Sequence, residues 1–362
     1  MKVFLQSQRE NPIFPSVNWA KTCILSKIGI ILTCFLFLMS TASCASKDIK
    51  TPISKTEFYF DTIVSVQIYD KKQDYLLDEC MNLCEKYENI FSKTAPESEL
   101  YQLNARKLPK NPDGSFTISP ELYEVIKQGL AYTEKSDGSF SITLGKVTAL
   151  WDFSGSTTPT LPEKRKIKDA ISHTDSKNIT LEDNNRIFIY DDALILDLGG
   201  IAKGYIADRL KEYLISEGVN SAIIDLGGNL LCIGQKGNHP FHIGIQRPFA
   251  DRSETIATMQ IQNKSVVSSG IYERFFESEG QLYHHIINPQ TGYPYENDLI
   301  AVTIVADTSI QADALSTLTF SLGYEKGLEF IESQPDADAV FIKTDGSIHY
   351  STDFIKKYQV QD

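Results

Sequence analysis

The segment DLGGIAKGYIAD, from Asp197 to Asp208, joins a short apolar run to a long amphipathic stretch. The run before it, ALIL, predicts a buried strand, and RLKEYLISEG after it predicts a helix that ends at Gly218. Two glycines at the junction let a ligand approach the backbone, and a helix N-terminus offers free N–H groups to an anion. Lys203 lies near that end, where the helix dipole disfavours a cation. The segment therefore favours an anionic ligand, although a plain turn with a surface lysine has the same composition.

The N-terminal region predicts export. Lys21 and Lys27 precede the apolar stretch 28–39, which is too short for a comfortable membrane span and is followed by small residues. The alternative is a transmembrane anchor. STASC, ending at Cys44, resembles a bacterial lipobox, with Thr41 where leucine is usual. We predict a signal peptide over 1–44 with lipidation at Cys44, a tether over 45–56 and a catalytic domain over 57–362. The protein would be anchored to the cell membrane and face outside the cytoplasm.

Composition narrows the class of protein. The net charge of −12 argues against a nucleic-acid partner, which would require a basic patch, and 42% hydrophobic residues fit a large globular core. Cys80 and Cys84 lie four residues apart on a predicted helix. No further Cys or His pair nearby completes a zinc set, so we interpret them as buried thiols.

Hydrophobic periodicity predicts an α+β fold. Helices are predicted over 76–91, 119–138 and 308–323, the last with Thr308 and Gln311 as a capping box and Gly323 as its end. Residues 58–70 predict one strand, 221–234, 241–248, 254–270 and 299–307 predict further strands, and 336–352 predict a hairpin that turns at Asp345-Gly346.

Two groups of polar residues are candidates for chemistry. Asp313 and Thr317 are spaced i,i+4 on one helix face, and their oxygens suit Mg²⁺ beside a substrate phosphate; a solvated face is the alternative. In LYHHIINPQTGYP, His284 and His285 would point to opposite faces of a strand, so one of them could face a site as a base; an ordinary structural histidine is the alternative.

Seven segments in order resemble the ApbE family of FAD:protein FMN transferases. They cover nearly the whole body from about Phe58 to Ile331, and the seven together make a chance match very unlikely. The segments are FSKTAPESELYQLN, GSFSITLGKVTALWDF, DLGGIAKGYIAD, DLGGNLLCIG, VVSSGIYERFF, HIINPQTGYP and VADTSIQADALSTLTFSLG.

The resemblance implies a mixed-sheet α+β fold, related to the T-fold, with a flavin site in a cleft between two lobes. It implies Mg²⁺-dependent transfer of FMN from FAD to a Ser or Thr hydroxyl of a partner protein, with release of AMP. The partner would be a membrane or extracellular redox protein. The alternatives are a Mg²⁺-dependent FAD pyrophosphatase and a flavin-binding lipoprotein without catalysis.

The resemblance also implies roles for individual residues. His285 would be the base, and the second DLGG, Asp225–Gly228, would be an analogous strand end rather than a second active site. Mg²⁺ would be bound by the Gly200 carbonyl, Asp313 and Thr317. FAD would be contacted by Phe60, Thr94, Thr143, Leu144, Gly145, Asp197, Lys203 and Ile286.

Overall fold

An eight-stranded antiparallel sheet forms the centre of the structure, a computed structural model that describes residues 51–153, 159–251 and 253–361. The strand order is β1-β2-β6-β7-β10-β13-β14-β15. The strands are β1 Ile53–Tyr59, β2 Thr62–Ile68, β6 Ser221–Leu226, β7 Asn229–Gly234, β10 Ser265–Gly270, β13 Leu299–Ala306, β14 Ala337–Lys343 and β15 Ile348–Tyr350.

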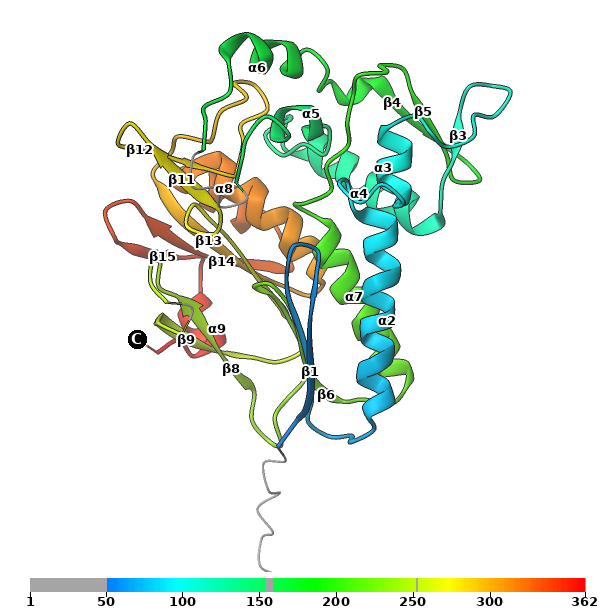
Figure 1. The fold of residues 1–362 in the computed structure, drawn as a ribbon. Helices are drawn as coiled ribbons and strands as arrows, with labels where there is room; N and C mark the ends of the chain where they lie inside the picture. Colours follow the sequence, from blue (N-terminus) through cyan, green and yellow to red (C-terminus); the bar gives the residue numbers. More distant parts are fainter. Residues whose placement is uncertain (1–50, 154–158, 252, 362) are drawn as a thin grey trace, which may run out of the picture. The chain divides into compact units, whose positions relative to one another are not determined.

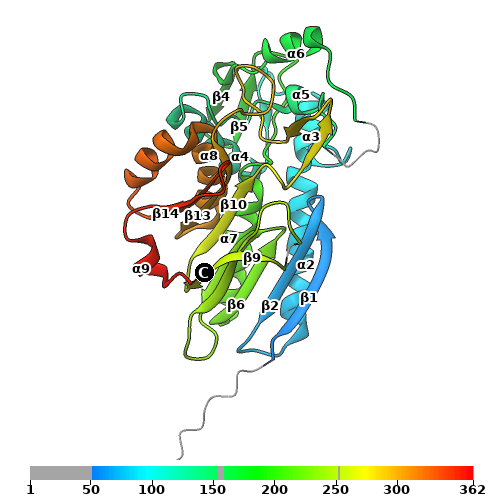
Figure 2. The ribbon, with the colours of Figure 1, turned by 90° about the vertical axis from the view of Figure 1, so that its left-hand side faces the viewer.

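Long helices cover one face of this sheet (Figures 1 and 2). They are α2 Asp74–Phe91, α7 Ala202–Ser216 and α8 Ser309–Glu332, with α4 Pro120–Lys135 packed beside them. The opposite face is covered by a second antiparallel pair, β8 Phe241–Gln246 with β9 Thr255–Ile261, and by α9 Phe354–Tyr358. Both faces are therefore covered over the middle of the sheet, whereas Phe58 of β1 and Ile63 of β2 are exposed.

Smaller elements gather at one end of the sheet, at the top of Figure 1. They are α3 Glu99–Asn104, β3 Phe116–Thr117, α5 Gly145–Thr148, α6 Lys164–Ile171, the 3₁₀ turn Ser176–Asn178, β4 Ile179–Glu182, β5 Arg186–Ile189, β11 Phe275–Ser278 and β12 Gln281–His284. β3, β5 and β4 form a three-stranded sheet, and β11 pairs with β12. Most of the predicted site residues lie where this end meets the long helices.

The predicted helices and the closing hairpin are confirmed. Ser119 caps α4 by accepting a hydrogen bond from Leu122 N, and Gly346 takes a positive φ in the β14–β15 turn. Gly323 has a non-helical φ of 74° within α8, so the first helical stretch ends there. Cys80 and Cys84 are free, buried thiols, as predicted, and burial raises the pKa of each to about 12.

The N-terminal strand prediction was wrong in one respect. Residues 58–70 do not form one strand, because Phe60 and Asp61 both adopt a positive φ and turn the chain back between β1 and β2. β1 already begins at Ile53, within the segment predicted as a tether. The predicted signal peptide and Cys44 lie outside the described residues. None of the helices in 51–153, 159–251 and 253–361 is long and apolar enough to cross a membrane.

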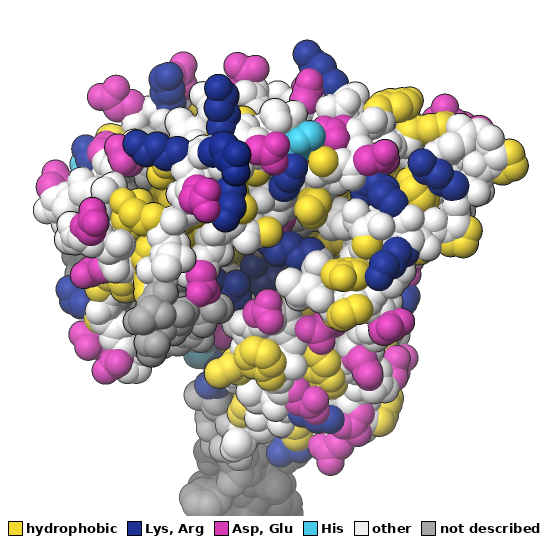
Figure 3. All heavy atoms as spheres, turned by 45° about the horizontal axis from the view of Figure 1, so that its top comes forward, with side chains coloured by type: hydrophobic (Ala, Val, Ile, Leu, Met, Phe, Trp, Pro, Cys, Tyr) yellow, Lys and Arg dark blue, Asp and Glu magenta, His cyan; other side chains and the backbone are white. Residues whose placement is uncertain are grey.

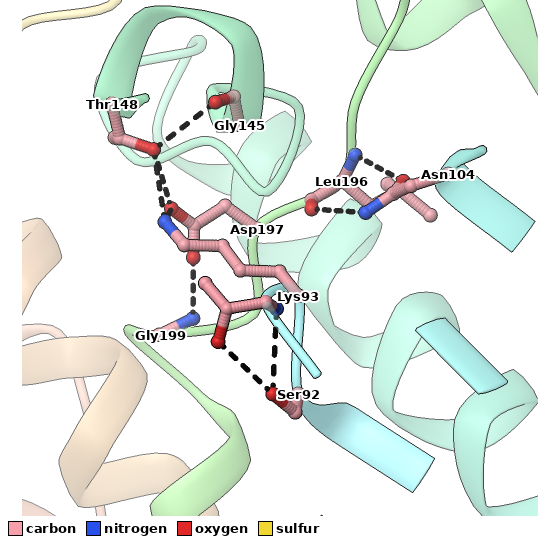
Figure 4. A network of polar contacts seen from close by, with 9 residues as sticks. Ser92, Lys93, Asn104, Gly145, Thr148, Leu196, Asp197 and Gly199 are labelled. Atoms are coloured by element: carbon pink, nitrogen blue, oxygen red, sulfur yellow. Dashed lines mark hydrogen bonds and ion pairs between the residues drawn. The ribbon is translucent and has the colours of Figure 1, made fainter. Parts of the chain in front are cut away.

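The predicted strand ALIL is buried but is not a strand. Leu194 and Leu196 have no exposed surface, yet no strand in the described part of the chain pairs with this run. The side-chain amide of Asn104 takes the place of a strand partner for Leu196 (Figure 4). Leu196 N donates to Asn104 Oδ1 at 2.8 Å, and Asn104 Nδ2 donates to Leu196 O at 2.9 Å. A single side chain therefore satisfies backbone groups that the sequence assigned to a sheet.

Candidate active site

Asp197 stands at the centre of a network that joins three segments (Figure 4). Its carboxylate forms an ion pair with Lys93 and accepts hydrogen bonds from Thr148 Oγ1 at 2.7 Å and from Gly199 N at 3.0 Å. Burial alone would raise the pKa of Asp197, but the Lys93 ammonium and these donors lower it below its usual range. The carboxylate is therefore charged, and it fixes the loop after α2 and helix α5 to the DLGG turn.

Lys93 and Thr148 were not among the predicted site residues. Lys93 Nζ also donates to Thr148 Oγ1 at 3.0 Å, so all three side chains bind one another. Lys93 directly precedes Thr94 in a segment that the family resemblance already covered, and this neighbourhood was the available signal. Its partner lies more than a hundred residues away along the chain, so spacing alone could not show the contact.

The DLGG turn leads into α7 as predicted, and Lys203 occupies its first turn. Lys203 Nζ lies 3.4 Å from the Gly199 carbonyl oxygen, and its charge acts on both Asp313 and His285. Gly200 lies close to α8: a Cβ built on Gly200 would come within 3.6 Å of Thr317 Oγ1. The structure thus brings the predicted metal ligands Gly200 and Thr317 together.

The carboxylate of Asp313 is held by the start of α7. Asp313 is 4% exposed, and its Oδ2 accepts a hydrogen bond from Gly204 N at 2.9 Å. Gly204 has to be glycine, because a Cβ there would lie 2.4 Å from the carbonyl oxygen of Ser309. Burial raises the pKa of Asp313, and Asp313 forms no ion pair with any residue that the structure describes. A buried carboxylate without a bound cation partner is a fitting ligand for a metal ion.

The residue that follows the second DLGG, Asn229, lies beside the Asp313 carboxylate. The tetrad forms the β6–β7 hairpin turn, where Gly228 N donates to Asp225 Oδ1 at 2.8 Å, and the next residue is Asn229. Asn229 is 1% exposed; its Oδ1 accepts from Ser309 Oγ at 2.6 Å, and its amide lowers the pKa of Asp313. The tetrad is therefore a hairpin turn that places the Asn229 amide beside Asp313, and sequence analysis did not single out Asn229.

The start of α8 is not capped as predicted. Thr308 makes no side-chain cap, and the capping box with Gln311 does not form. Asp208, from α7, instead accepts hydrogen bonds from Ser309 N and Ile310 N, both at 2.9 Å. A carboxylate favours a helix N-terminus because of the free N–H groups there. The last residue of the opening motif therefore fixes the helix that carries Asp313 and Thr317.

His284 and His285 differ in their surroundings. His284 is 5% exposed; its Nδ1 accepts from Ile286 N at 3.3 Å, and its Nε2 donates to Tyr295 O at 3.0 Å. Its two ring nitrogens are thereby occupied, and burial lowers its pKa to about 4. His284 is a structural histidine.

His285 has one ring nitrogen left for chemistry. Its Nδ1 donates to Arg274 O at 3.3 Å, which leaves the Nε2 lone pair without a hydrogen bond from any described residue. Burial lowers the pKa of His285 to about 3, and the charges of Arg274 and Lys203 act in the same direction. The imidazole is therefore neutral near pH 7, and its Nε2 can accept a proton.

Three of the predicted flavin contacts lie beside parts of the site already described. Phe60 lies in the β1–β2 turn, which Arg274 reaches by donating to Asp61 O at 3.3 Å; this turn therefore lies near His285. Leu144 and Gly145 adjoin the Asp197 network, since Gly145 O accepts from Thr148 Oγ1 at 3.3 Å.

The remaining three predicted contacts differ in exposure. Thr94 is exposed, whereas Ile286 is buried. The Thr143 side chain is fully buried, and its hydroxyl donates to Thr174 O at 2.5 Å, so this hydroxyl is already bonded within the protein.

The surface at this end of the molecule is hollowed, and Lys and Arg side chains line the hollow (Figure 3). No group of three His, Cys, Asp or Glu side chains that could hold a metal occurs in the described part of the chain. The arrangement instead offers one carboxylate, one hydroxyl and one backbone carbonyl. Such a set suits Mg²⁺ only when phosphate oxygens complete its shell.

Comparison with known proteins gives the family. Residues 60–341 match the profile of the ApbE family. The chain belongs to this family. It is 31% identical over 360 residues to a curated FAD:protein FMN transferase of Treponema pallidum, covering 94% of this chain and 97% of that protein. It is 33% identical over 278 residues to one of Klebsiella pneumoniae, covering 76% of this chain and 85% of the relative.

Solved ApbE structures share the fold. The crystal structure of the ApbE protein from Thermotoga maritima superposes with a TM-score of 0.75 at 30% identity, covering 84% of this chain and 98% of that one. The flavin transferase ApbE from Vibrio cholerae also gives 0.75, at 24% identity, covering 85% of this chain and 99% of that one. The predictions of an ApbE-family transferase and of its mixed α+β fold are therefore confirmed.

Proposed function

We propose that this protein transfers the FMN half of FAD to a Ser or Thr hydroxyl of a partner protein and releases AMP. The observation that carries the proposal is that three groups lie in one region: a neutral histidine, a cation at a helix N-terminus and a buried carboxylate. Among the described residues, Nε2 of the histidine accepts no hydrogen bond, and the carboxylate forms no ion pair. The names of the curated relatives support the same activity.

His285 acts as the general base. The acceptor hydroxyl oxygen attacks the phosphorus of the FMN half, the bond from that phosphorus to the bridging oxygen breaks, and AMP leaves with the bridging oxygen. The hydroxyl proton passes to Nε2 of His285, whose Nδ1–H stays on the Arg274 carbonyl. The carbonyl thus fixes the tautomer and the ring orientation that proton transfer requires.

Lys203 and the first turn of α7 hold the pyrophosphate. The N–H groups of that turn and the Lys203 ammonium both favour negative charge, and Gly199 and Gly200 allow a close approach of the phosphates. Charge neutralisation and positioning account for most of the catalysis of phosphoryl transfer. Leu144 and Gly145 provide the wall for the flavin, and the Asp197 network fixes that wall in place.

The Gly200 carbonyl, Asp313 and Thr317 would hold Mg²⁺. When bound, this ion would neutralise charge on the pyrophosphate and on the AMP leaving group. Asp208 and Asn229 keep α8 and Asp313 in the position that this ligand set needs.

Water could replace the acceptor hydroxyl, and the enzyme would then be an FAD pyrophosphatase that gives FMN and AMP. Co-expression with a candidate acceptor tests the proposal: in-gel flavin fluorescence on the acceptor supports the transferase, whereas AMP release without covalent flavin supports the hydrolase. Absence of AMP release would leave only a flavin-binding protein.

We also propose that the protein is exported and anchored at the membrane through Cys44. The basic residues, the short apolar stretch and the lipobox-like STASC support this location. An acceptor on the same side of the membrane, such as a membrane or extracellular redox protein, would then be within reach.

A further inference from the structure

A groove of about 900 Å³ lies beside the candidate active site and contains none of the residues assigned to FAD or Mg²⁺. One wall is α6, and the other consists of β12 and the segment 290–297. All four residues of β12 line it, and His285 follows β12 directly. We call this feature the β12 groove.

The charged residues of α6 are arranged unevenly around the β12 groove. Lys164 and Lys168, spaced i,i+4, line it; both are exposed, and neither forms an ion pair with any residue that the structure describes. Lys166, outside the lining, pairs with Glu163 at 2.8 Å. Two unpaired lysines thus face one groove of a protein whose net charge is −12. Glu296 is the acidic residue in the lining.

β12 offers backbone groups to an extended chain. It pairs with β11 in a two-stranded sheet, and its other edge has no strand partner within the described ranges. An exposed strand edge can bind a further strand through main-chain hydrogen bonds. Ile171 on α6 and Tyr283 on β12, both partly exposed, add apolar contact surface to the groove.

Resting on the transferase activity proposed above, we propose that the β12 groove binds an extended, acidic segment of the acceptor protein alongside β12. The segment's carboxylates meet Lys164 and Lys168, and its Ser or Thr lies at the end of β12, where His285 takes the hydroxyl proton. A strand advances about 3.3 Å per residue. Acidic residues within a few positions of the hydroxyl therefore lie along the groove.

Synthetic peptides test this surface on the full chain. Twelve-residue peptides with one central Thr and acidic, neutral or basic flanks are incubated with FAD and Mg²⁺, and peptide-bound flavin fluorescence gives kcat/KM. We expect acidic peptides to be the best substrates of the wild type. The double variant Lys164→Glu/Lys168→Glu should lower kcat/KM for them by roughly tenfold, less at high salt, because exposed charge contacts are weak and screened.

The control variant is Arg165→Glu/Lys166→Glu, which makes the same change in net charge on the same helix outside the groove. It should behave as the wild type, and both variants should keep FAD affinity and peptide-free AMP release. A second readout tests the strand edge: because strand addition uses alternate N–H groups, N-methylation of alternate residues should block labelling in one register and spare it in the other.

The possible results distinguish a failure of the proposed transferase function from a failure of the groove proposal. If the wild type neither cleaves FAD nor labels any acceptor, the proposed function fails. If FAD is cleaved but short peptides are not labelled, or are labelled without preference for acidic flanks, the groove proposal is wrong. It is also wrong if both double variants lose activity equally. Loss of binding to phosphatidylglycerol vesicles in Lys164→Glu/Lys168→Glu, with peptide labelling unchanged, would assign the lysines to a lipid surface.

Discussion

Replacing Lys93 by Met tests whether the ion pair with Asp197 holds the site together. The change keeps most of the aliphatic stem but removes the ammonium, so Asp197 retains only its hydrogen bonds from Thr148 Oγ1 and Gly199 N. A buried carboxylate that loses its counter-charge keeps the cost of desolvation without the compensating attraction. We expect lower global stability and weaker FAD binding.

The magnitude follows from the exposure of the two side chains. Asp197 is 15% exposed and Lys93 is 35% exposed, so the pair lies between a surface ion pair, worth about 0–1 kcal/mol, and a fully buried pair, whose breakage costs about 3–5 kcal/mol. We expect Lys93→Met to lower the free energy of unfolding by about 2 kcal/mol near pH 7. Asp197→Asn in the Lys93→Met background should recover part of this, since an amide has no charge to leave unpaired.

The assay is a double-mutant cycle in urea, with Lys93→Met, Asp197→Asn and the double variant. The coupling should be about 1–3 kcal/mol at neutral pH. The pKa of Asp197 is lowered in the folded state, so its ionised carboxylate stabilises the fold above about pH 4. This contribution to the free energy of unfolding is lost as the pH falls through the folded-state pKa. The coupling should therefore shrink in acid. Additive effects of the two single changes at pH 7 would refute the reasoning.

Four further outcomes are expected. His285→Ala should keep FAD binding and lower transfer roughly 10²–10⁴-fold, whereas an equal loss in His284→Ala alone would reverse the assignment. In wild type, FAD titrated by fluorescence quenching should bind more tightly with Mg²⁺ than in EDTA, and Asp313→Ala should abolish that difference together with AMP release. Protonation of His284 should lower the free energy of unfolding by about 3 kcal/mol as pH falls from 6.5 to 4, because its pKa is lowered to about 4; His284→Asn should make that part of the stability profile in urea denaturation less steep, and the slope that remains should come from His285, whose pKa is also lowered. Cys44→Ala should stop partition into detergent, and wild-type partition by this variant would exclude a lipid anchor.

Local patterns predicted most of the regular elements. The helices α2, α4 and α7 and the closing hairpin follow from periodicity, caps and turn residues within a few positions of each other. The Phe60-Asp61 turn was missed because neither residue is glycine, although both adopt a positive φ. ALIL was assigned to a strand because an apolar run does not reveal whether its backbone partner is a strand or the side chain of Asn104.

The sequence predicted those site residues that lie together within one local motif. Asp313 and Thr317 share a helix face, and Gly200 and Lys203 share a turn, so their grouping is local. Four other residues bind partners that are distant in the sequence, and nothing in the local sequence indicates those partners: Lys93, Thr148, Asp208 and Asn229. The roles of His284 and His285 were left to the resemblance, because which neighbour is enclosed depends on Tyr295 and Arg274.

The strand order determines when each strand can find its partner during synthesis. β2 pairs with β6, and Val64 lies opposite Leu226, so the β1–β2 hairpin has no partner on its inner edge until the chain beyond position 226 has been made. At about 5–20 residues per second, this delay is on the order of 10–30 seconds. During that time an apolar hairpin edge is open to other chains, and pairing over such a separation slows folding. A chaperone that covers the edge of this hairpin would therefore protect the nascent chain during the delay.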